Sequence, residues 1–190
     1  MNKFLVALFA LVFVSSAFAA PIEEHEFIVK IGVQPQSQVK FDEKENTNIG
    51  IAAGFEYYKY FGNIFALGAG ALYELPREFK EDSFGNFSVS FLPLFVGVKA
   101  RTPVQGLSND YGFATLRLGY SPIMTSNANG FIRNESGGLY FAGGLGMNID
   151  MLVIEAVYAQ NKFSYTDVSS GRSEDATNST ITLFVGMKFE

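Results

Sequence analysis

The stretch STITLFVGMKF, residues 179–189, stands near the end of the sequence and is followed by Glu190. Alternate positions in it are apolar, and the positions between them are mostly small or polar; the apolar set is Ile181, Leu183, Val185, Met187 and Phe189. A period of two is typical of a β-strand with one apolar and one polar face. The stretch therefore predicts a strand whose apolar face must be covered by something outside the strand itself.

Seven further segments upstream show the same alternation. They span residues 26–34, 48–58, 64–75, 86–100, 111–120, 138–149 and 151–165, and polar or glycine-containing connections separate them. After the first 20 residues no apolar run is long enough for a membrane helix, which needs about 20 residues. Eight alternating segments of this kind predict an all-β fold, an eight-stranded antiparallel up-and-down barrel.

The first residues have the pattern of a cleavable export signal. Lys3 precedes an apolar run over residues 4–14, and Ser15 to Ala19 supply an A-x-A cleavage site. We therefore predict a signal peptide over residues 1–19 and a single barrel domain over residues 20–190.

Composition excludes several classes of function. The formal net charge is −5, and it becomes −6 once Lys3 leaves with the signal peptide, which argues against a nucleic-acid partner. The chain contains no cysteine, so neither disulfides nor thiolate metal sites contribute to the fold. Hydrophobic residues nevertheless make up 48% of the sequence, as expected for strands with one face in lipid.

The non-apolar faces of the segments decide between two kinds of barrel. A soluble lipocalin-like barrel keeps its apolar residues inside, whereas a transmembrane barrel places them outside, in lipid. The non-apolar faces here carry charges one at a time among glycines, which suits a narrow lumen better than a surface in water. We therefore predict a transmembrane barrel with a structural ion network in its lumen, made of Lys30, Glu56, Lys99, Arg117, Glu155 and Lys188. An ion-conducting or catalytic role for these charges is the alternative.

Two finer expectations concern the strands. Pro93 stands inside the fourth segment, and central strand positions disfavour proline. We therefore expect a bulge at Leu92 and Pro93 that reverses which side chains before it point outward. The reversal would turn Phe87, Val89 and Phe91 toward lipid. Aromatic residues at the strand ends predict interfacial girdles; they are Tyr57, Tyr58, Tyr60, Phe61, Tyr73, Phe79, Phe84, Tyr111, Phe163, Tyr165 and Phe189.

Catalytic and metal-binding patterns are weak in this sequence. His25 is the one histidine, and it stands before the first segment, so a histidine-based triad has no base inside the barrel. The acidic pairs fall in polar connections and lack the convergence a cation site needs. We expect no catalytic residue, no metal site and no cofactor.

The final segment resembles the C-terminal signature of bacterial outer-membrane β-barrels, an alternating strand ending in an aromatic residue. Here Phe189 is penultimate, and Val185, Met187 and Phe189 are the positions that the barrel-assembly machinery would read. With the export signal, eight segments and inward charges, the chain resembles the OmpA/OmpX-like superfamily, including its opacity and LomR-like group. The resemblance implies a bacterial outer-membrane protein, monomeric and in contact with lipid. Connections one, three, five and seven are long and polar while two and six are very short, which predicts that the first strand starts at the periplasmic end.

Three roles follow from this resemblance. The first is a noncatalytic barrel that serves envelope integrity or surface contact. The second is an OmpW-like barrel that binds or passes small hydrophobic molecules, which requires Phe87, Val89 and Phe91 to point into the lumen. The third is an adhesin that contacts a host or surface ligand through the loops at residues 35–47 and 121–137.

Overall fold

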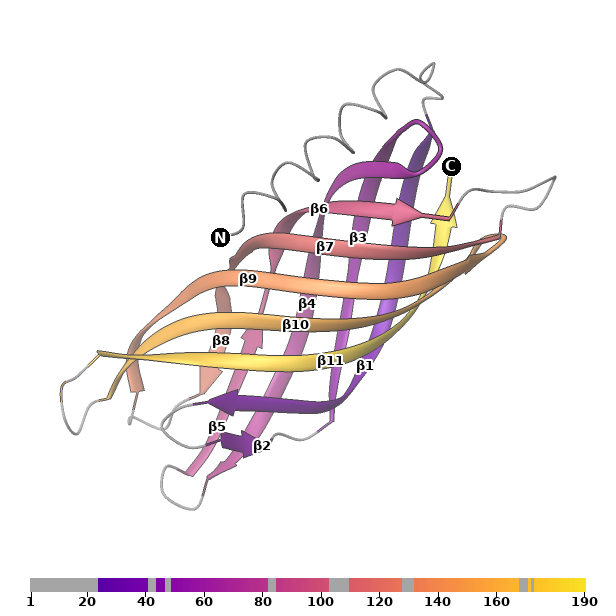
Figure 1. The fold of residues 1–190 in the computed structure, drawn as a ribbon. Helices are drawn as coiled ribbons and strands as arrows, with labels where there is room; N and C mark the ends of the chain where they lie inside the picture. Colours follow the sequence, from indigo (N-terminus) through magenta and orange to yellow (C-terminus); the bar gives the residue numbers. More distant parts are fainter. Residues whose placement is uncertain are drawn as a thin grey trace.

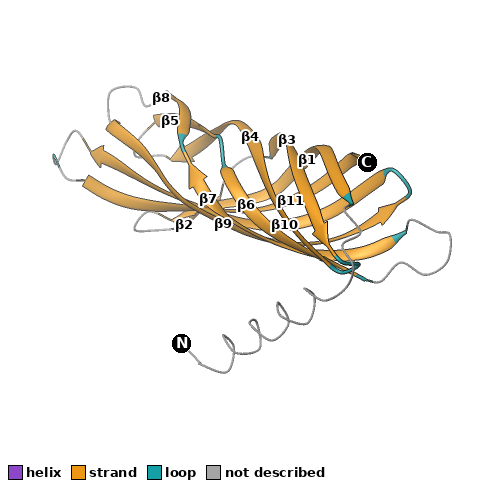
Figure 2. Cartoon of the chain, turned by 90° about the horizontal axis from the view of Figure 1, so that it is seen from above, coloured by secondary structure: helices purple, strands orange, loops and turns teal. Residues whose placement is uncertain are grey.

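A computed structural model describes residues 24–40, 44–46, 49–81, 85–102, 110–127, 132–167, 171 and 173–190. The predicted signal peptide lies outside these residues. All of the regular structure in the described part is β (Figures 1 and 2). The strands are β1 His25–Lys40, β2 Lys44–Asn46, β3 Gly50–Phe61, β4 Phe65–Glu81, β5 Gly85–Phe91, β6 Leu94–Arg101, β7 Tyr111–Ser121, β8 Ile123–Asn127, β9 Ile132–Ile149, β10 Leu152–Asp167 and β11 Ser173–Phe189.

These strands form one closed barrel with eight walls. β5 and β6 follow each other along one wall, β7 and β8 follow each other along the next, and β2 pairs with the far end of β1. Neighbouring walls pair antiparallel, and β11 pairs with β1 so that Phe189 lies opposite Phe27. The stretch at residues 179–189 is therefore the strand that closes the barrel, and the predicted fold class is confirmed.

The described part of the chain contains no helix with the length and apolar character needed to cross a membrane.

The apolar faces of the strands point outward and the polar faces point into the lumen. In β11, Ile181, Leu183 and Val185 are about half exposed, whereas Thr182 and Lys188 are buried. The same division holds for β7, where Leu116 and Leu118 are exposed on either side of the buried Arg117. A soluble barrel would have the opposite arrangement, so the lipocalin-like alternative is excluded and the exterior is suited to lipid.

The two ends of the barrel differ in their connections. The end with tight turns, which we name the turn end, has Gly62 and Asp150 at φ values of 76° and 54°. The C-terminus lies at this end, since the Lys188 amide donates to the Met151 carbonyl at 2.8 Å. At the opposite end, the loop end, β1 runs on to residue 40, and β8 and β9 occupy much of 121–137. The two predicted loops are therefore partly strand, because backbone pairing continues beyond the apolar alternation.

The predicted reversal of facing at Pro93 is wrong. Val89 and Phe91 are buried in the lumen, and Leu94 beyond the break is exposed, so alternation runs unbroken through Leu92 and Pro93. Irregularities lie in both neighbouring strands. From Glu74 to Arg77, β4 advances three residues while β5 advances two, and from Ile123 to Thr125, β8 advances two residues while β5 advances one. The extra residues bend β4 and β8 and leave the facing of β5 unchanged. The side chain of Phe87 lies outside the described residues.

The predicted aromatic girdles hold for only some of the residues. Tyr57, Phe61, Tyr73 and Phe189 are exposed on the barrel exterior, as a girdle requires. Five others point into the lumen and are buried, because they fall on the opposite parity of their strands: Tyr58, Tyr60, Tyr111, Phe163 and Tyr165. The side chains of Phe79 and Phe84 lie outside the described residues. The lumen is therefore more aromatic than the sequence pattern predicts.

Candidate functional site in the barrel lumen

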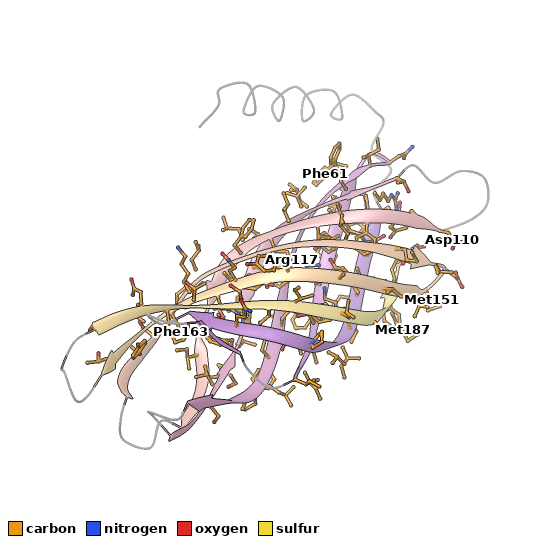
Figure 3. The ribbon with its side chains drawn as sticks, turned by 60° about the horizontal axis from the view of Figure 1, so that its bottom comes forward. Phe61, Asp110, Arg117, Met151, Phe163 and Met187 are labelled. Carbon is orange, nitrogen blue, oxygen red and sulfur yellow. The ribbon has the colours of Figure 1, made fainter. Side chains whose placement is uncertain are left out.

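Four charged side chains meet near the middle of the lumen, at the height of Arg117 in Figure 3. Lys30 Nζ lies 2.6 Å from Glu56 Oε1 and 2.7 Å from Glu155 Oε2. Arg117 Nε lies 3.0 Å from Glu56 Oε1, and its Nη2 lies 2.6 Å from Glu155 Oε1. We name these four residues the ion quartet; it joins β1, β3, β7 and β10 across the barrel.

The sequence makes room for the ion quartet with small residues. Thr115 donates to Glu155 Oε1 at 2.7 Å, and the ammonium of Lys30 lies 4.4 Å from the centroid of the Phe184 ring. A Cβ built on Gly144 would lie 2.5 Å from Glu155 Oε1, so a side chain at this position would collide with the carboxylate. Glycine on the lumen face of β9 is therefore part of the site.

The charges within the ion quartet balance, with two cations against two carboxylates. Each of the four side chains is at most 2% exposed. Burying charge costs several kcal/mol per ion, and only close pairing with good geometry offsets that cost. The quartet therefore fills the middle of the lumen with mutually dependent charges.

A second group of charges lies nearer the turn end. Lys99 Nζ donates to Glu26 Oε2 at 2.6 Å, and the Tyr111 hydroxyl donates to the same carboxylate. Arg101 donates to both oxygens of Glu24, at 2.7 and 2.5 Å. This donation holds the pKa of the Glu24 carboxyl below its usual range. We name Glu24, Glu26, Lys99, Arg101 and Tyr111 the turn-end cluster.

The six charged residues selected from the sequence therefore do not form one network. Lys30, Glu56, Arg117 and Glu155 come together, while the nearest carboxylate to Lys99 is that of Glu26. Lys188 contacts Glu190 at 2.6 Å at the barrel rim and stands apart from the ion quartet.

Sequence reasoning missed the role of Glu26 and Arg101. The alternation could have identified both residues. Glu26 lies on the same face of β1 as Lys30, and Arg101 lies on the same face of β6 as Lys99. Glu26 stands at the first position of the predicted strand, and Arg101 stands just after the end of its predicted strand. The alternation within the predicted segment identifies Glu26, and the same alternation extended by one residue identifies Arg101.

The lumen becomes apolar toward the loop end. We name the residues that form this part the apolar cup; they are Val89, Phe91, Ile123, Phe163, Tyr165 and Ala176. The ring centroids of Phe91 and Phe163 lie 5.6 Å apart, and those of Phe163 and Tyr165 lie 6.4 Å apart. The residues of the apolar cup come from walls that face each other across the lumen. Figure 3 places Phe163 toward the loop end from Arg117.

A thin polar layer separates the apolar cup from the ion quartet. Asn161 Nδ2 donates to Glu74 Oε1 at 3.1 Å, across the lumen from β10 to β4. Tyr140, beside Asn161 in the neighbouring strand, is fully buried, and its ring lies 5.6 Å from that of Phe95. On the lumen face of β10, the buried apolar residues Val157 and Ala159 lie between Glu155 of the ion quartet and Asn161, so charged, apolar and polar side chains alternate below the apolar cup.

The histidine stands apart from these levels. His25 is exposed at the start of β1, where its Nδ1 lies 2.5 Å from the Tyr57 hydroxyl on the barrel exterior. Across the ranges that the structure describes, no three His, Asp or Glu side chains come together in a way that could hold a metal ion.

Comparisons with solved structures identify the architecture. The chain aligns with the outer-membrane protein OprG of Pseudomonas aeruginosa at 14% identity and a TM-score of 0.54, over 88% of this chain and 97% of OprG. It aligns with Ail, the attachment invasion locus protein of Yersinia pestis, at 20% identity and a TM-score of 0.51, over 87% and 99%. Neisserial surface protein A aligns at 10% identity and a TM-score of 0.52, over 88% and 100%. No family profile and no curated protein sequence matches the chain.

The fold and the lumen together define the class of this protein. It has the eight-stranded β-barrel fold of bacterial outer-membrane proteins, with its apolar strand faces outward, where they suit lipid, and its charges inside. The OmpA/OmpX-like resemblance is thus confirmed for the fold. In such barrels the short turns face the periplasm and the longer loops face the exterior. We expect the same orientation here, with the turn end toward the periplasm and the loop end toward the exterior.

Proposed function

We propose that this protein is a noncatalytic outer-membrane barrel that is closed to ions at its middle and binds small apolar molecules in its extracellular half. The observation that carries the proposal is the inward orientation of Val89 and Phe91, which face Phe163 and Tyr165 within the apolar cup. This is the feature that the sequence required of a barrel for small hydrophobic molecules.

The chemistry of the cup supports the proposal. Binding sites for small molecules are concave and lined mainly by apolar and aromatic side chains with few polar groups. Below the cup, the paired charges of the ion quartet leave no free carboxylate or ammonium to attract a passing ion, which supports a site closed at its base.

A direct test uses the absence of tryptophan from the chain. Phe163→Trp places a single fluorescent reporter in the apolar cup, and Phe141→Trp places one on the lipid-facing side of β9. Nitrobenzene, a small apolar quencher, should quench the Phe163→Trp variant saturably. The Phe141→Trp control should show linear quenching from nitrobenzene dissolved in the lipid. Linear quenching of both variants would reject binding in the cup.

Surface contact remains a separate prediction from the sequence. The similarity to Ail, whose name describes attachment and invasion, is consistent with such a role. The residues that would make the contact, around 35–47 and 121–137, fall partly outside the described residues. Binding of cells that display a host surface, compared before and after loop replacement, would test this prediction.

A further inference from the structure

The base of the apolar cup has a specific chemistry. Glu74 lies opposite Phe91 in the pairing of β4 with β5, and Asn161 stands two residues before Phe163 on the lumen face of β10. The Phe91–Phe163 ring contact and the Asn161–Glu74 hydrogen bond therefore join the same two sides of the lumen at successive levels. Any molecule between the two rings would rest on the polar pair.

Two polar atoms at this base have no partner in the described part of the chain. They are the hydroxyl of Tyr140 and the side-chain oxygen of Asn161, and both residues are fully buried. The two residues are direct neighbours in the pairing of β9 with β10. A buried polar atom left without a hydrogen bond costs about 1 to 3 kcal/mol, so its retention calls for a bound group that satisfies it.

We propose that the lumen binds small amphipathic molecules whose apolar body parts the rings of Phe91 and Phe163. Their head donates one hydrogen bond to the side-chain oxygen of Asn161 and forms a second with the Tyr140 hydroxyl, which can accept or donate. This inference rests on the proposed function and names its ligand class. The head is a hydroxyl or an amine, because the Asn161 oxygen and the Glu74 carboxylate both accept hydrogen bonds. A pure hydrocarbon would leave both atoms unsatisfied, and a carboxylate head would face the like charge of Glu74.

The test compares ligands that share one body. The probes are 4-fluorotoluene, 4-fluorophenol and 4-fluorobenzylamine, followed by fluorine NMR with the folded protein in micelles and with empty micelles as the reference for partitioning. We expect saturable binding, with 4-fluorophenol or 4-fluorobenzylamine about tenfold tighter than 4-fluorotoluene, the size of one hydrogen bond to a buried acceptor. The tighter of the two identifies the preferred head as hydroxyl or amine.

The variant Tyr140→Phe removes one unsatisfied hydroxyl and nothing else, so folding should be retained. It should weaken 4-fluorophenol about fivefold and leave 4-fluorotoluene unchanged, by loss of one neutral hydrogen bond. Tyr158→Phe, which removes a hydroxyl from the lipid-facing side of β10, is the matched control and should change neither affinity. A shift between unboiled and boiled gel mobility verifies that each variant is folded.

The outcomes separate the two proposals. Saturable binding with equal affinity for all three probes overturns the amphipathic ligand class and leaves the apolar site standing. Absence of saturable binding by every probe overturns the proposed function as well. An equal loss of 4-fluorophenol affinity in Tyr140→Phe and in the Tyr158→Phe control also contradicts the inference.

Discussion

At the scale of single residues, the ion quartet depends on shared partners. Lys30 contacts two carboxylates, and each of those carboxylates also contacts Arg117. Neutralising one member therefore alters the surroundings of the other three. Replacement of one partner in a buried pair is costly because it leaves a charge without compensation.

Glu56→Gln tests this dependence while keeping the shape of the side chain. We expect the free energy of unfolding to fall by about 3 to 5 kcal/mol, since one cation of the quartet loses its counter-charge. Urea unfolding in lipid vesicles, followed by gel mobility, measures the change. Glu190→Gln is the control: this half-exposed residue pairs with Lys188, and its loss should cost no more than about 1 kcal/mol. Unchanged stability together with altered single-channel conductance in Glu56→Gln would mean that the quartet conducts ions and is not a structural plug.

At the scale of elements, two adjacent positions of one strand differ in whether they have room for a side chain. Gly143 and Gly144 are neighbours in β9, yet an added Cβ would find its nearest atom at 3.6 Å from the first and at 2.5 Å from the second. The first position faces lipid and the second faces the ion quartet. Glycine is thus needed at Gly144 by packing and is optional at Gly143.

The pair of variants Gly143→Ala and Gly144→Ala isolates this difference. Gly144→Ala should lower the free energy of unfolding by about 1 to 3 kcal/mol, because the methyl group must displace Glu155 or Thr115. Gly143→Ala should stay within about 0.5 kcal/mol of the parent chain. The same unfolding assay measures both. Equal effects of the two substitutions would contradict the inward facing of Gly144.

The closing strand carries a separate prediction about assembly. Phe189 lies on the exterior opposite Phe27, with the two ring centroids 6.5 Å apart. Deleting both Phe189 and Glu190 should impair insertion into the outer membrane more than deleting Glu190 alone, because the aromatic residue is the feature proposed to be read. The heat-modifiable fraction in isolated outer membranes provides the measurement. Similar yields from the two truncations would show that the penultimate Phe189 is not read.

At the scale of the whole molecule, the barrel is continuous around its circumference and its buried charges are unevenly placed along its axis. The turn-end cluster and the ion quartet lie at the turn end and in the middle, and the apolar cup lies toward the loop end. An aqueous path through eight strands would have to displace both groups of paired charges.

The intact protein should therefore behave as a folded but nonconducting barrel. We expect heat-modifiable mobility in detergent gels, recovery in the outer-membrane fraction and no steady conductance in planar lipid bilayers. The double variant Glu56→Gln and Glu155→Gln serves as a comparison, since it frees both cations of the quartet. A steady open channel in the parent chain would be incompatible with a closed lumen, and a soluble product that does not shift on boiling would be incompatible with the membrane assignment.

Outside the segment that Pro93 interrupts, the sequence alone determined which face of each strand is apolar and which charged residues enter the lumen. Period two is a local property, so the inward facing of Lys30, Glu56, Arg117 and Glu155 could be predicted from their own segments. The same locality identified residues 179–189 as a strand with an apolar face. The alternation does not fix the position of a side chain along the barrel axis, because that position depends on how far each strand is shifted against its neighbours.

Only the tertiary structure decided which side chains meet. Closure of β1 on β11 fixes the shift of every strand at once, and this shift pairs Lys99 with Glu26 and leaves Lys188 at the rim. The irregularities beside Pro93 fall in the strands next to β5, so Phe91 keeps its inward facing and its ring lies against that of Phe163. The physical reason is that register around a closed barrel is a collective quantity: each pairing constrains all the others, and no single segment contains it.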